Sequence, residues 1–413
     1  MSLRLQRDIA CDALSANTVA SNLSSAMRVD TVETISASNF IPSQSLSTTS
    51  ITLTTGSTFA SGSNDRWTAG VLAQNGKIYC IPRRATEVGV IDPVANTFDT
   101  TSVIPINGTS MSNTKWFTGC LASNGKIYCA PHNFSRGVAV IDPDENTIDD
   151  SAVTLTTGST FVGTQLYGST CPGIDGKLYC VPTSATNVCV IDPDLNTANT
   201  TLFTLSTGSS LVGTYKWYGS VIGPDGKIYG IPYSSTKVCA IDPATNIVNT
   251  ESFTLTAGST LSGSSKWFGG VLAPNGKIYG VPYVSSRVCI IDPIAKTVDT
   301  TTVVPSPGTP TLSSMQYKYV GGALSTDGKI YCIPQNETTV LVIDPAANLY
   351  SRTSVSIDTG STLPPASFLY EGTVLGPNGR VYGIPSNALN VPVVKPSLPV
   401  LPPWMLSPAF NKF

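Results

Sequence analysis

The most regularly placed residues that could do chemistry are the aspartates of a recurring Ile-Asp-Pro sequence. They are Asp92, Asp142, Asp192, Asp242, Asp292 and Asp344. In each copy the lysine of an Asx-Gly-Lys sequence precedes the aspartate, as Lys227 precedes Asp242. One interpretation is a ring of carboxylates and ammonium groups that binds a polar ligand. The other is a cross-strand ion pair followed by an Asp-Pro turn. We favour the ion pair, because a binding site breaks the symmetry of a repeat and this feature preserves it.

The last copy departs from this pattern, because Lys395 takes the aspartate position and faces Arg380. Two like charges at one place could dock an acidic partner, which makes Arg380 and Lys395 candidate binding residues. The alternative, which we favour, is a solvated seam beside the C-terminal segment.

A second basic set directly precedes a row of aromatic residues. The cations are Arg66, Lys115, Lys216, Lys266 and Lys318, and most of them are followed by a tryptophan, as Lys216 is by Trp217. Cations beside aromatic rings can bind sugars or single-stranded nucleic acid. Neighbouring residues of a strand point to opposite faces, however. We therefore expect the aromatics to form core and the cations to line an open rim, where they are candidate ligand-binding residues.

Catalytic and metal-binding side chains are scarce. His132 is the single histidine, which excludes a multi-histidine metal site and argues against a Ser-His-Asp triad. We expect it to be exposed on a loop. Asp65 and Glu371 are too few to form a carboxylate cage around Ca²⁺ or Mg²⁺. We predict no metal, no cofactor and no catalytic residue.

Seven of the ten cysteines occupy two repeat positions where other copies carry mostly glycine, which indicates small apolar residues rather than a disulfide framework. Only Cys180 and Cys189 face each other within one copy. A disulfide there remains an alternative to two thiols.

The elements that must position these residues are seven copies of a repeat of about fifty residues. Each copy contains an Asx-Gly turn, then a Lys or Arg, a Tyr and a Pro, with an aromatic residue nine positions before the glycine. The turn glycines are Gly76, Gly125, Gly176, Gly226, Gly276, Gly328 and Gly379.

Each copy predicts four short strands, which in the fourth copy are residues 217–223, 227–232, 238–242 and 252–256. The Asp225-Gly226 pair between the first two indicates a type I′ turn. One such sheet cannot bury both of its faces, so the sheets must stack around an axis. The sequence predicts an all-β, closed seven-bladed β-propeller of four-stranded antiparallel blades.

The seventh copy becomes proline-rich where its fourth strand should be, whereas residues 48–53 match residues 200–205. We predict a propeller over residues 48–396 in which residues 48–56 complete the last blade. The alternative is that residues 404–408 supply this strand.

An N-terminal arm, residues 1–47, and a Pro-rich C-terminal tail, residues 397–413, lie outside the ring. The tail carries Trp404, Met405 and Phe410. We expect both segments to anchor the ring to other protein subunits.

The composition limits the remaining partners. The net charge is −2 and charged residues make up 12% of the chain, which does not favour nucleic acid. No apolar run approaches the roughly 20 residues that span a bilayer, so we expect no membrane insertion. The N-terminus lacks the apolar region of a signal peptide, which predicts synthesis in the cytoplasm.

The segment Pro224–Asn246 resembles the repeats of streptogramin-lyase-like and gluconolactonase-like propellers, and of kelch-like arrays, and the resemblance extends over residues 48–396. The lyases use a histidine with a glutamate and a divalent ion, and the gluconolactonase-like hydrolases hold a metal with Glu, Asn and Asp. His132 lies in no matching motif, so the resemblance implies the fold and not the chemistry. Propellers with terminal arms and few charges also occur in virus and phage particles, and this chain resembles such components.

We therefore predict a non-catalytic scaffold or binding module, a structural or adhesion component of a large assembly such as a phage or virus particle, where it would serve in host attachment. One alternative is a lyase or hydrolase of the streptogramin-lyase-like group, which would require His132 and a metal. A second alternative is a lectin that binds a surface glycan.

Overall fold

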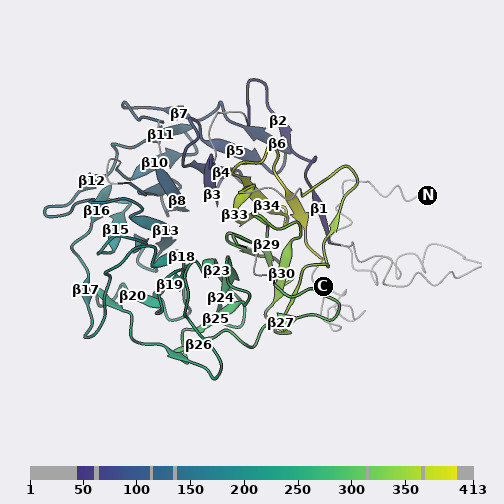
Figure 1. Ribbon diagram of the computed structural model, residues 1–413. Helices are drawn as coiled ribbons and strands as arrows, with labels where there is room; N and C mark the ends of the chain where they lie inside the picture. Colours follow the sequence, from purple (N-terminus) through teal and green to yellow (C-terminus); the bar gives the residue numbers. More distant parts are fainter. Residues whose placement is uncertain are drawn as a thin grey trace, which may run out of the picture.

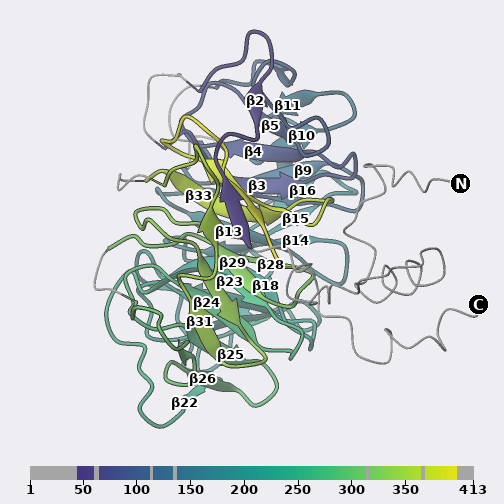
Figure 2. The same cartoon turned by 90° about the vertical axis from the view of Figure 1, so that its right-hand side faces the viewer.

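The computed structural model describes residues 44–59, 65–111, 115–133, 137–312, 316–363 and 368–397. In this part of the chain every regular element is a strand, and the strands form seven sheets of five strands each. The sheets are arranged as blades around a central axis (Figure 1), and Figure 2 shows the same ring turned by 90°. The predicted seven-bladed β-propeller is confirmed.

The strands occupy equivalent places in successive blades. The innermost strands are β3 (Trp67–Leu72), β8 (Trp116–Leu121), β13 (Tyr167–Pro172), β18 (Trp217–Ile222), β23 (Trp267–Leu272), β28 (Ala323–Leu324) and β33 (Tyr370–Leu375). The second strands are β4 (Ile78–Pro82), β9 (Ile127–Pro131), β14 (Leu178–Pro182), β19 (Ile228–Pro232), β24 (Ile278–Pro282), β29 (Ile330–Cys332) and β34 (Val381–Pro385). The third strands are β5 (Gly89–Asp92), β10 (Ala139–Asp142), β15 (Cys189–Asp192), β20 (Cys239–Asp242), β25 (Cys289–Asp292), β30 (Leu341–Asp344) and β35 (Val393–Lys395).

The two outer places are filled by very short strands. The fourth strands are β6 (Thr97–Asp99), β11 (Thr147–Asp149), β16 (Thr197–Asn199), β21 (Ile247–Asn249), β26 (Thr297–Asp299), β31 (Leu349–Ser351) and β1 (Ser45–Ser47). The outermost strands are β2 (Thr52–Leu53), β7 (Ile104–Pro105), β12 (Thr154–Leu155), β17 (Thr204–Leu205), β22 (Thr254–Leu255), β27 (Val304–Pro305) and β32 (Ser356–Ile357).

The predicted fourth strand is wrong, because residues 252–256 belong to the next blade. There β22 pairs in parallel with β26. The true fourth strand of the blade is β21, which pairs antiparallel with β20 directly after a tight turn. Asn246 has a φ of +54° in this turn, a conformation that asparagine adopts more readily than most residues. The blades are therefore five-stranded.

Closure of the ring by the N-terminal region is confirmed, but the predicted segment is wrong. The strand that completes the last blade is β1, which pairs antiparallel with β35 and parallel with β32. Residues 48–56 instead lead into the first blade, where β2 pairs with β6. The place beside β35 is taken by β1, and the alternative segment, residues 404–408, lies outside the described residues. Figure 1 shows the purple β1 among the yellow-green strands of the last blade.

The Asx-Gly turns are not of type I′, because only their glycines have positive φ, as Gly76 does at +79°. Gly76 N donates to Ala73 O at 3.0 Å and Ala73 N donates to Lys77 O at 2.9 Å, which describes a type I turn followed by a left-handed glycine. The side chain of Asn75 accepts from Lys77 N at 3.0 Å and donates to Tyr79 Oη at 3.1 Å. These contacts explain why Asx, Gly and Tyr recur together.

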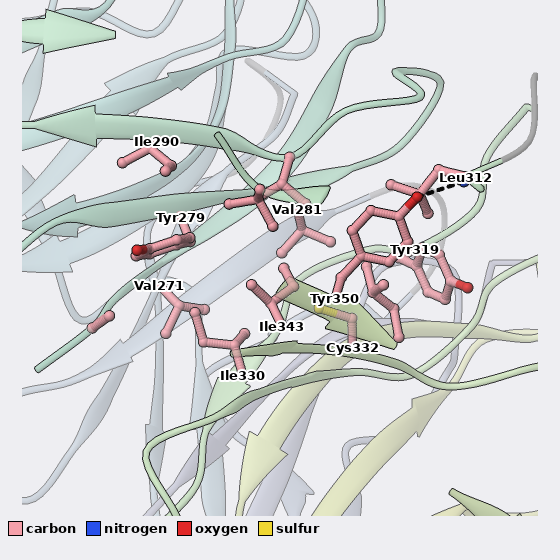
Figure 3. Packing of buried hydrophobic residues seen from close by; sticks show 14 residues of the cluster. Val271, Tyr279, Val281, Ile290, Leu312, Tyr319, Ile330, Cys332, Ile343 and Tyr350 are labelled. Carbon is pink, nitrogen blue, oxygen red and sulfur yellow. Dashed lines mark hydrogen bonds between the residues drawn. The ribbon is translucent and has the colours of Figure 1, made fainter. Parts of the chain in front are cut away.

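The core lies between the blades. Both faces of each sheet are buried, so that Tyr279 and Val281 of β24 pack against the sixth blade while Ile278 packs against the fourth. Figure 3 shows the cluster between the fifth and sixth blades, where Tyr350 Oη accepts a hydrogen bond from Leu312 N at 3.0 Å. The row of tryptophans that begins the innermost strands is buried, as predicted.

The innermost strands crowd the axis closely. Gly219 has a φ of +88°, and a Cβ at this position would collide with the backbone of Gly269 in the next blade. Only glycine satisfies both conditions. The innermost strands of these two blades therefore approach each other more closely than a side chain at this position would allow.

The repeated Lys and Asp residues form the predicted ion pairs. Six pairs lie between second and third strands, with N–O distances from 2.9 Å for Lys227 and Asp242 to 3.6 Å for Lys77 and Asp92. Each aspartate also caps its own turn, as Asp242 Oδ1 accepts from Ala244 N at 3.0 Å. The symmetric feature is therefore structural.

The nine cysteines in the described part of the chain are thiols, and all but Cys120 are buried. Cys180 and Cys189 face each other across β14 and β15, but they form no disulfide. The interpretation of cysteine as a small apolar residue is confirmed at these positions.

Candidate functional site

A closed ring of backbone hydrogen bonds, here called the belt, encircles one end of the axis. It joins the start of each innermost strand to the end of each second strand, with N–O distances from 2.8 to 3.3 Å. Going round, its residues are Arg66, Arg83, Lys115, His132, Leu166, Thr183, Lys216, Tyr233, Lys266, Tyr283, Lys318, Gln335, Leu369 and Ser386. The amide of each donates to the carbonyl of the one before it, and Arg66 donates to Ser386. We call this end of the axis the belt mouth and the opposite end, where the Asx-Gly turns lie, the turn face.

The prediction that the basic set forms an open rim is wrong, because all five side chains are buried. Each cation donates to a backbone carbonyl of the preceding blade: Lys115 to Ala85 O, Lys216 to Ala185 O, Lys266 to Ser235 O, Lys318 to Val284 O and Arg66 to Ala388 O. Burial lowers the pKa of Lys216, Lys266 and Lys318 to about 8. These residues connect blades, and they offer no accessible charge to a partner.

Many of the side chains at the belt mouth come from two repeat positions. The position after the innermost aromatic carries Thr68, Phe117, Gly168, Tyr218, Phe268, Val320 and Glu371. The position after the second-strand proline carries Arg83, His132, Thr183, Tyr233, Tyr283, Gln335 and Ser386. The neighbouring positions always carry an aromatic residue and a proline, so the repeat loses its symmetry at the belt mouth.

Seven of the aromatic rings around this end form a continuous layer, the aromatic floor. They are Phe117, Tyr218, Tyr233, Phe268, Tyr283, Tyr317 and Phe368. The ring centroids of Phe117 and Phe268, from the second and fifth blades, lie 5.8 Å apart, so the floor extends across the axis. Tyr218 stacks on Phe268 at 4.6 Å. A cavity of about 190 Å³ between the innermost strands is lined by Phe117 and Phe268 together with small residues such as Gly219.

Polar side chains lie beside the floor. Gln335 Nε2 donates to Glu371 Oε1 at 2.8 Å, and Asp65 Oδ2 lies 3.3 Å from Arg83 Nη1. The guanidinium of Arg83 sits over the ring of Phe117, 5.3 Å from its centroid.

Burial raises the pKa of Glu371 to about 7, and the positive charge of Arg83 limits the rise. The charge of Glu371 in turn contributes to the raised pKa of Tyr283, after burial and Tyr233.

His132 is not exposed, which corrects the sequence-based prediction. Only 2% of its surface is accessible, and its ring stacks on Phe117 with centroids 5.2 Å apart. Burial, followed by the charge of Arg83, lowers the pKa of His132 to about 3, so the imidazole is neutral at pH 7. Within the described residues no group of three or more His, Cys, Asp or Glu side chains is placed to hold a metal ion.

The remaining candidates lie at the turn face or outside the described residues. Val381 pairs with Val394, which places Arg380 opposite Lys395, as the sequence predicted. Binding of an acidic partner there stays a prediction. Trp404, Met405 and Phe410 lie outside the described residues, as do residues 1–43.

The two ends of the described chain meet at the turn face. Gln44 Nε2 donates to Ser397 Oγ at 3.3 Å, and Ser397 Oγ donates to Asp327 Oδ2 at 2.6 Å. Asp327 belongs to the Asx-Gly turn of the sixth copy. The described residues Gln44 and Ser397 therefore lie on the side opposite the belt mouth.

Solved structures with this architecture include two lyases. Streptogramin B lyase is 11% identical with a TM-score of 0.54, and the match covers 81% of this chain and 95% of that one. Virginiamycin B lyase from Staphylococcus aureus is 9% identical with a TM-score of 0.58, and the match covers 81% of this chain and 96% of that one. Identities this low establish a shared fold alone.

A third similar structure is the extracellular domain of a putative one-component system from Bacteroides thetaiotaomicron, which is 9% identical with a TM-score of 0.57. The match covers 83% of this chain and 42% of that one. No protein-family model and no curated protein sequence matches the chain. The predicted resemblance to streptogramin-lyase-like propellers is confirmed at the level of fold, which enzymes share with proteins of other functions.

In the part of the chain that the structure describes, no helix has the length and apolar character needed to cross a membrane.

Sequence reasoning missed the floor and the Gln335–Glu371 pair because it searched for residues that repeat. The signal that would have found them is a position that varies within the repeat. Two variable positions lie directly beside uniform ones in all seven copies, and such variation within a strict repeat marks where the ring is specialised.

Proposed function

We propose that this chain is a non-catalytic recognition propeller that binds a ligand at the belt mouth. The observation that carries the proposal is the loss of repeat symmetry at the two variable positions, Thr68 to Glu371 and Arg83 to Ser386, whose main chain is otherwise held in equivalent places. Mixed aromatic and polar side chains that converge on one end of a ring are typical of a ligand site.

The opposite side supports attachment to other subunits. Gln44 and Ser397, the described residues nearest the two predicted anchoring segments, lie together at the turn face. The predicted N-terminal arm loses Ser45–Ser47, which form β1 of the ring. Anchoring through the rest of residues 1–47 and through residues 397–413 remains part of the proposal. A virion or host-attachment role stays a prediction from the sequence, since no comparison supports it.

The test is ligand-observed NMR with a mixture of small saccharides, amines and dipeptides. We expect at least one compound to bind the intact chain and to lose its signal change in Tyr233→Ala and in Tyr283→Ala. The matched control is Ile294→Ala, which removes an exposed apolar side chain of the same blade as Tyr283, but at the turn face. Binding that survives both tyrosine substitutions would show that the ligand site is elsewhere.

A second candidate is an acid–base enzyme that uses the same mouth. The observation that favours it is Glu371, since a carboxyl with a pKa of about 7 suits proton transfer at neutral pH. One similar structure is a catalytically inactive variant of virginiamycin B lyase determined with quinupristin. Quinupristin is therefore the substrate to try first. If the intact chain turns it over and Glu371→Gln and His132→Ala do not, the enzyme is favoured; no turnover removes this candidate.

A further inference from the structure

We propose that the ligand of the belt mouth is a neutral saccharide, bound between the aromatic floor and the buried polar side chains Gln335, Glu371, Arg83 and His132. This inference rests on the proposed function, because it takes the mouth to be the binding site and names the class of molecule that fits it.

The aromatic floor supplies flat apolar surfaces on which a ligand can stack. Tyr233, Phe268, Tyr317 and Phe368 are half-buried, so their rings remain partly accessible. Successive rings are tilted, by 44° between Tyr283 and Tyr317 and by 33° between Tyr317 and Phe368. A pyranose ring has faces of C–H groups that pack on such rings through dispersion and weak hydrogen bonds. The many rings provide several stacking places rather than one slot.

Buried polar atoms beside the floor have no protein partner. Gln335 and Glu371 are 1% and 5% exposed, yet Gln335 Oε1 and Glu371 Oε2 receive no hydrogen bond. Arg83 Nε, which is a donor, and both ring nitrogens of His132 are also without a hydrogen-bond partner in the protein. Native proteins leave few such atoms unsatisfied, so this group of atoms at one mouth is suited to partners from outside the chain, either water or a ligand.

The mixture of these atoms indicates the ligand chemistry. Gln335 Oε1 and Glu371 Oε2 need donors, Arg83 Nε needs an acceptor, and a neutral imidazole needs one of each. A hydroxyl group both donates and accepts, so a polyol matches the whole set. Sugar hydroxyls carried by a ring with apolar faces satisfy the polar atoms and the floor together.

Charged ligands fit less well. A quaternary ammonium ion would find an aromatic cage, but the guanidinium of Arg83 already sits over Phe117 and would repel it. An anion would meet Arg83, but also the carboxyl groups of Glu371 and of Asp65, which already pairs with Arg83. A neutral ligand avoids both conflicts.

The experiment is a glycan array followed by titration of the best neutral oligosaccharide by calorimetry. We expect Tyr233→Ala and Gln335→Ala each to weaken binding about tenfold or more, and Ile294→Ala to leave it unchanged. A tenfold change corresponds to about 1.4 kcal/mol. If either variant fails to fold, as judged by its circular dichroism, Tyr233→Leu, which removes the aromatic face, and Glu371→Gln take its place, with losses of a few-fold expected.

Three results would contradict the proposal that the ligand is a neutral saccharide. An array without any bound neutral saccharide overturns it, and so does saccharide binding that the mouth substitutions leave unchanged. If tetramethylammonium or a dipeptide binds instead, and Tyr233→Ala abolishes that binding, the saccharide is wrong while the proposed function holds.

Discussion

A buried lysine is tolerated in a fold when its ammonium group has hydrogen-bond partners, and Lys216 shows how this chain provides them. Its Nζ donates to Ala185 O at 3.0 Å and to Gly213 O at 2.7 Å. The first carbonyl belongs to the preceding blade, and the second belongs to the loop before β18. Since burial lowers the pKa of Lys216 only to about 8, the side chain still carries its charge at pH 7 and joins two blades.

Replacing this lysine should therefore destabilise the ring. Lys216→Ala leaves two carbonyls without their donor, and we expect the free energy of unfolding to fall by about 1–3 kcal/mol in urea titrations. The control is Lys227→Ala in the same blade, where the surface ion pair with Asp242 is lost. Such pairs contribute about 0–1 kcal/mol. Equal losses in the two variants would contradict the assigned role of Lys216.

Glu371 should give the stability a measurable dependence on pH. Its pKa is raised from 4.5 to about 7 by burial, so between these values the folded chain binds more protons than the unfolded chain. The contribution of Glu371 is complete below pH 4.5 and is lost as the pH rises through 7. The unfolding free energy of the intact chain, relative to Glu371→Gln, should decrease from pH 4.5 to pH 7.5. A constant difference would mean that the carboxyl titrates normally.

At the scale of single residues, the sequence predicted the buried tryptophans and the Lys–Asp pairs, because each follows from strand alternation or from a hairpin register. It did not predict burial of the basic set. Strand alternation places Lys216 and Trp217 on opposite faces of the sheet. It does not reveal that the long side chain of Lys216 reaches a carbonyl of the preceding blade. His132 was misplaced for a similar reason, since its contact with Phe117 joins different strands.

The short strand β1 completes the last blade and so closes the ring. Its three residues pair with β35 on one side and β32 on the other, and Leu46 is fully buried between the blades. Without β1, the outermost strand β32 has no partner and the last blade exposes the edge of β35. The ring therefore depends on a short segment that lies far along the chain from the blade it completes.

Truncations on either side of β1 test this dependence. A chain beginning at Gln44 should keep the unfolding temperature of the full chain, since it retains every described strand. A chain beginning at Thr48 loses β1 and the burial of Leu46, which alone stabilises by about 2 kcal/mol. We expect the second chain to unfold at a clearly lower temperature in calorimetry. Equal unfolding temperatures would mean that another segment can complete the last blade.

At the scale of strands, the first three strands of each blade could be predicted, because an aromatic, an Asx-Gly turn and a proline mark their ends. The fourth and outermost strands could not. Strand β21 has three residues and follows its neighbour after a tight turn, and β22 pairs in parallel with a strand that comes much later in its own copy. Neither leaves a pattern of alternation long enough to recognise.

The whole molecule is a ring with two unlike ends. At the belt mouth the main chain is tied into a closed circle and the side chains differ from blade to blade. At the turn face the side chains repeat, and the described ends of the chain meet at Gln44 and Ser397. The seven-fold repeat thus forms the ring, and the departures from it are gathered where we propose that the ligand binds.

Hydrogen exchange should reveal the belt directly. Its amides are bonded in every blade and close on themselves, so they open only when blades separate. We expect the amides of residues such as Thr183 and Tyr283 to exchange most slowly, and those of the outermost strands, such as β17, to exchange much faster. Mass spectrometry of peptides from all seven blades provides the measurement. Rapid exchange in the belt of any one blade would show that the circle is open there.

The bonds of the belt use only amide and carbonyl groups, which every amino acid except proline can supply. The seven residues after the second-strand prolines, from Arg83 to Ser386, can therefore be exchanged for most others without loosening the circle that holds them. A combinatorial library at these seven codons would sample many different recognition surfaces on one unchanged frame. Natural drift can do the same, so relatives of this chain could acquire new specificities without first having to acquire a new architecture.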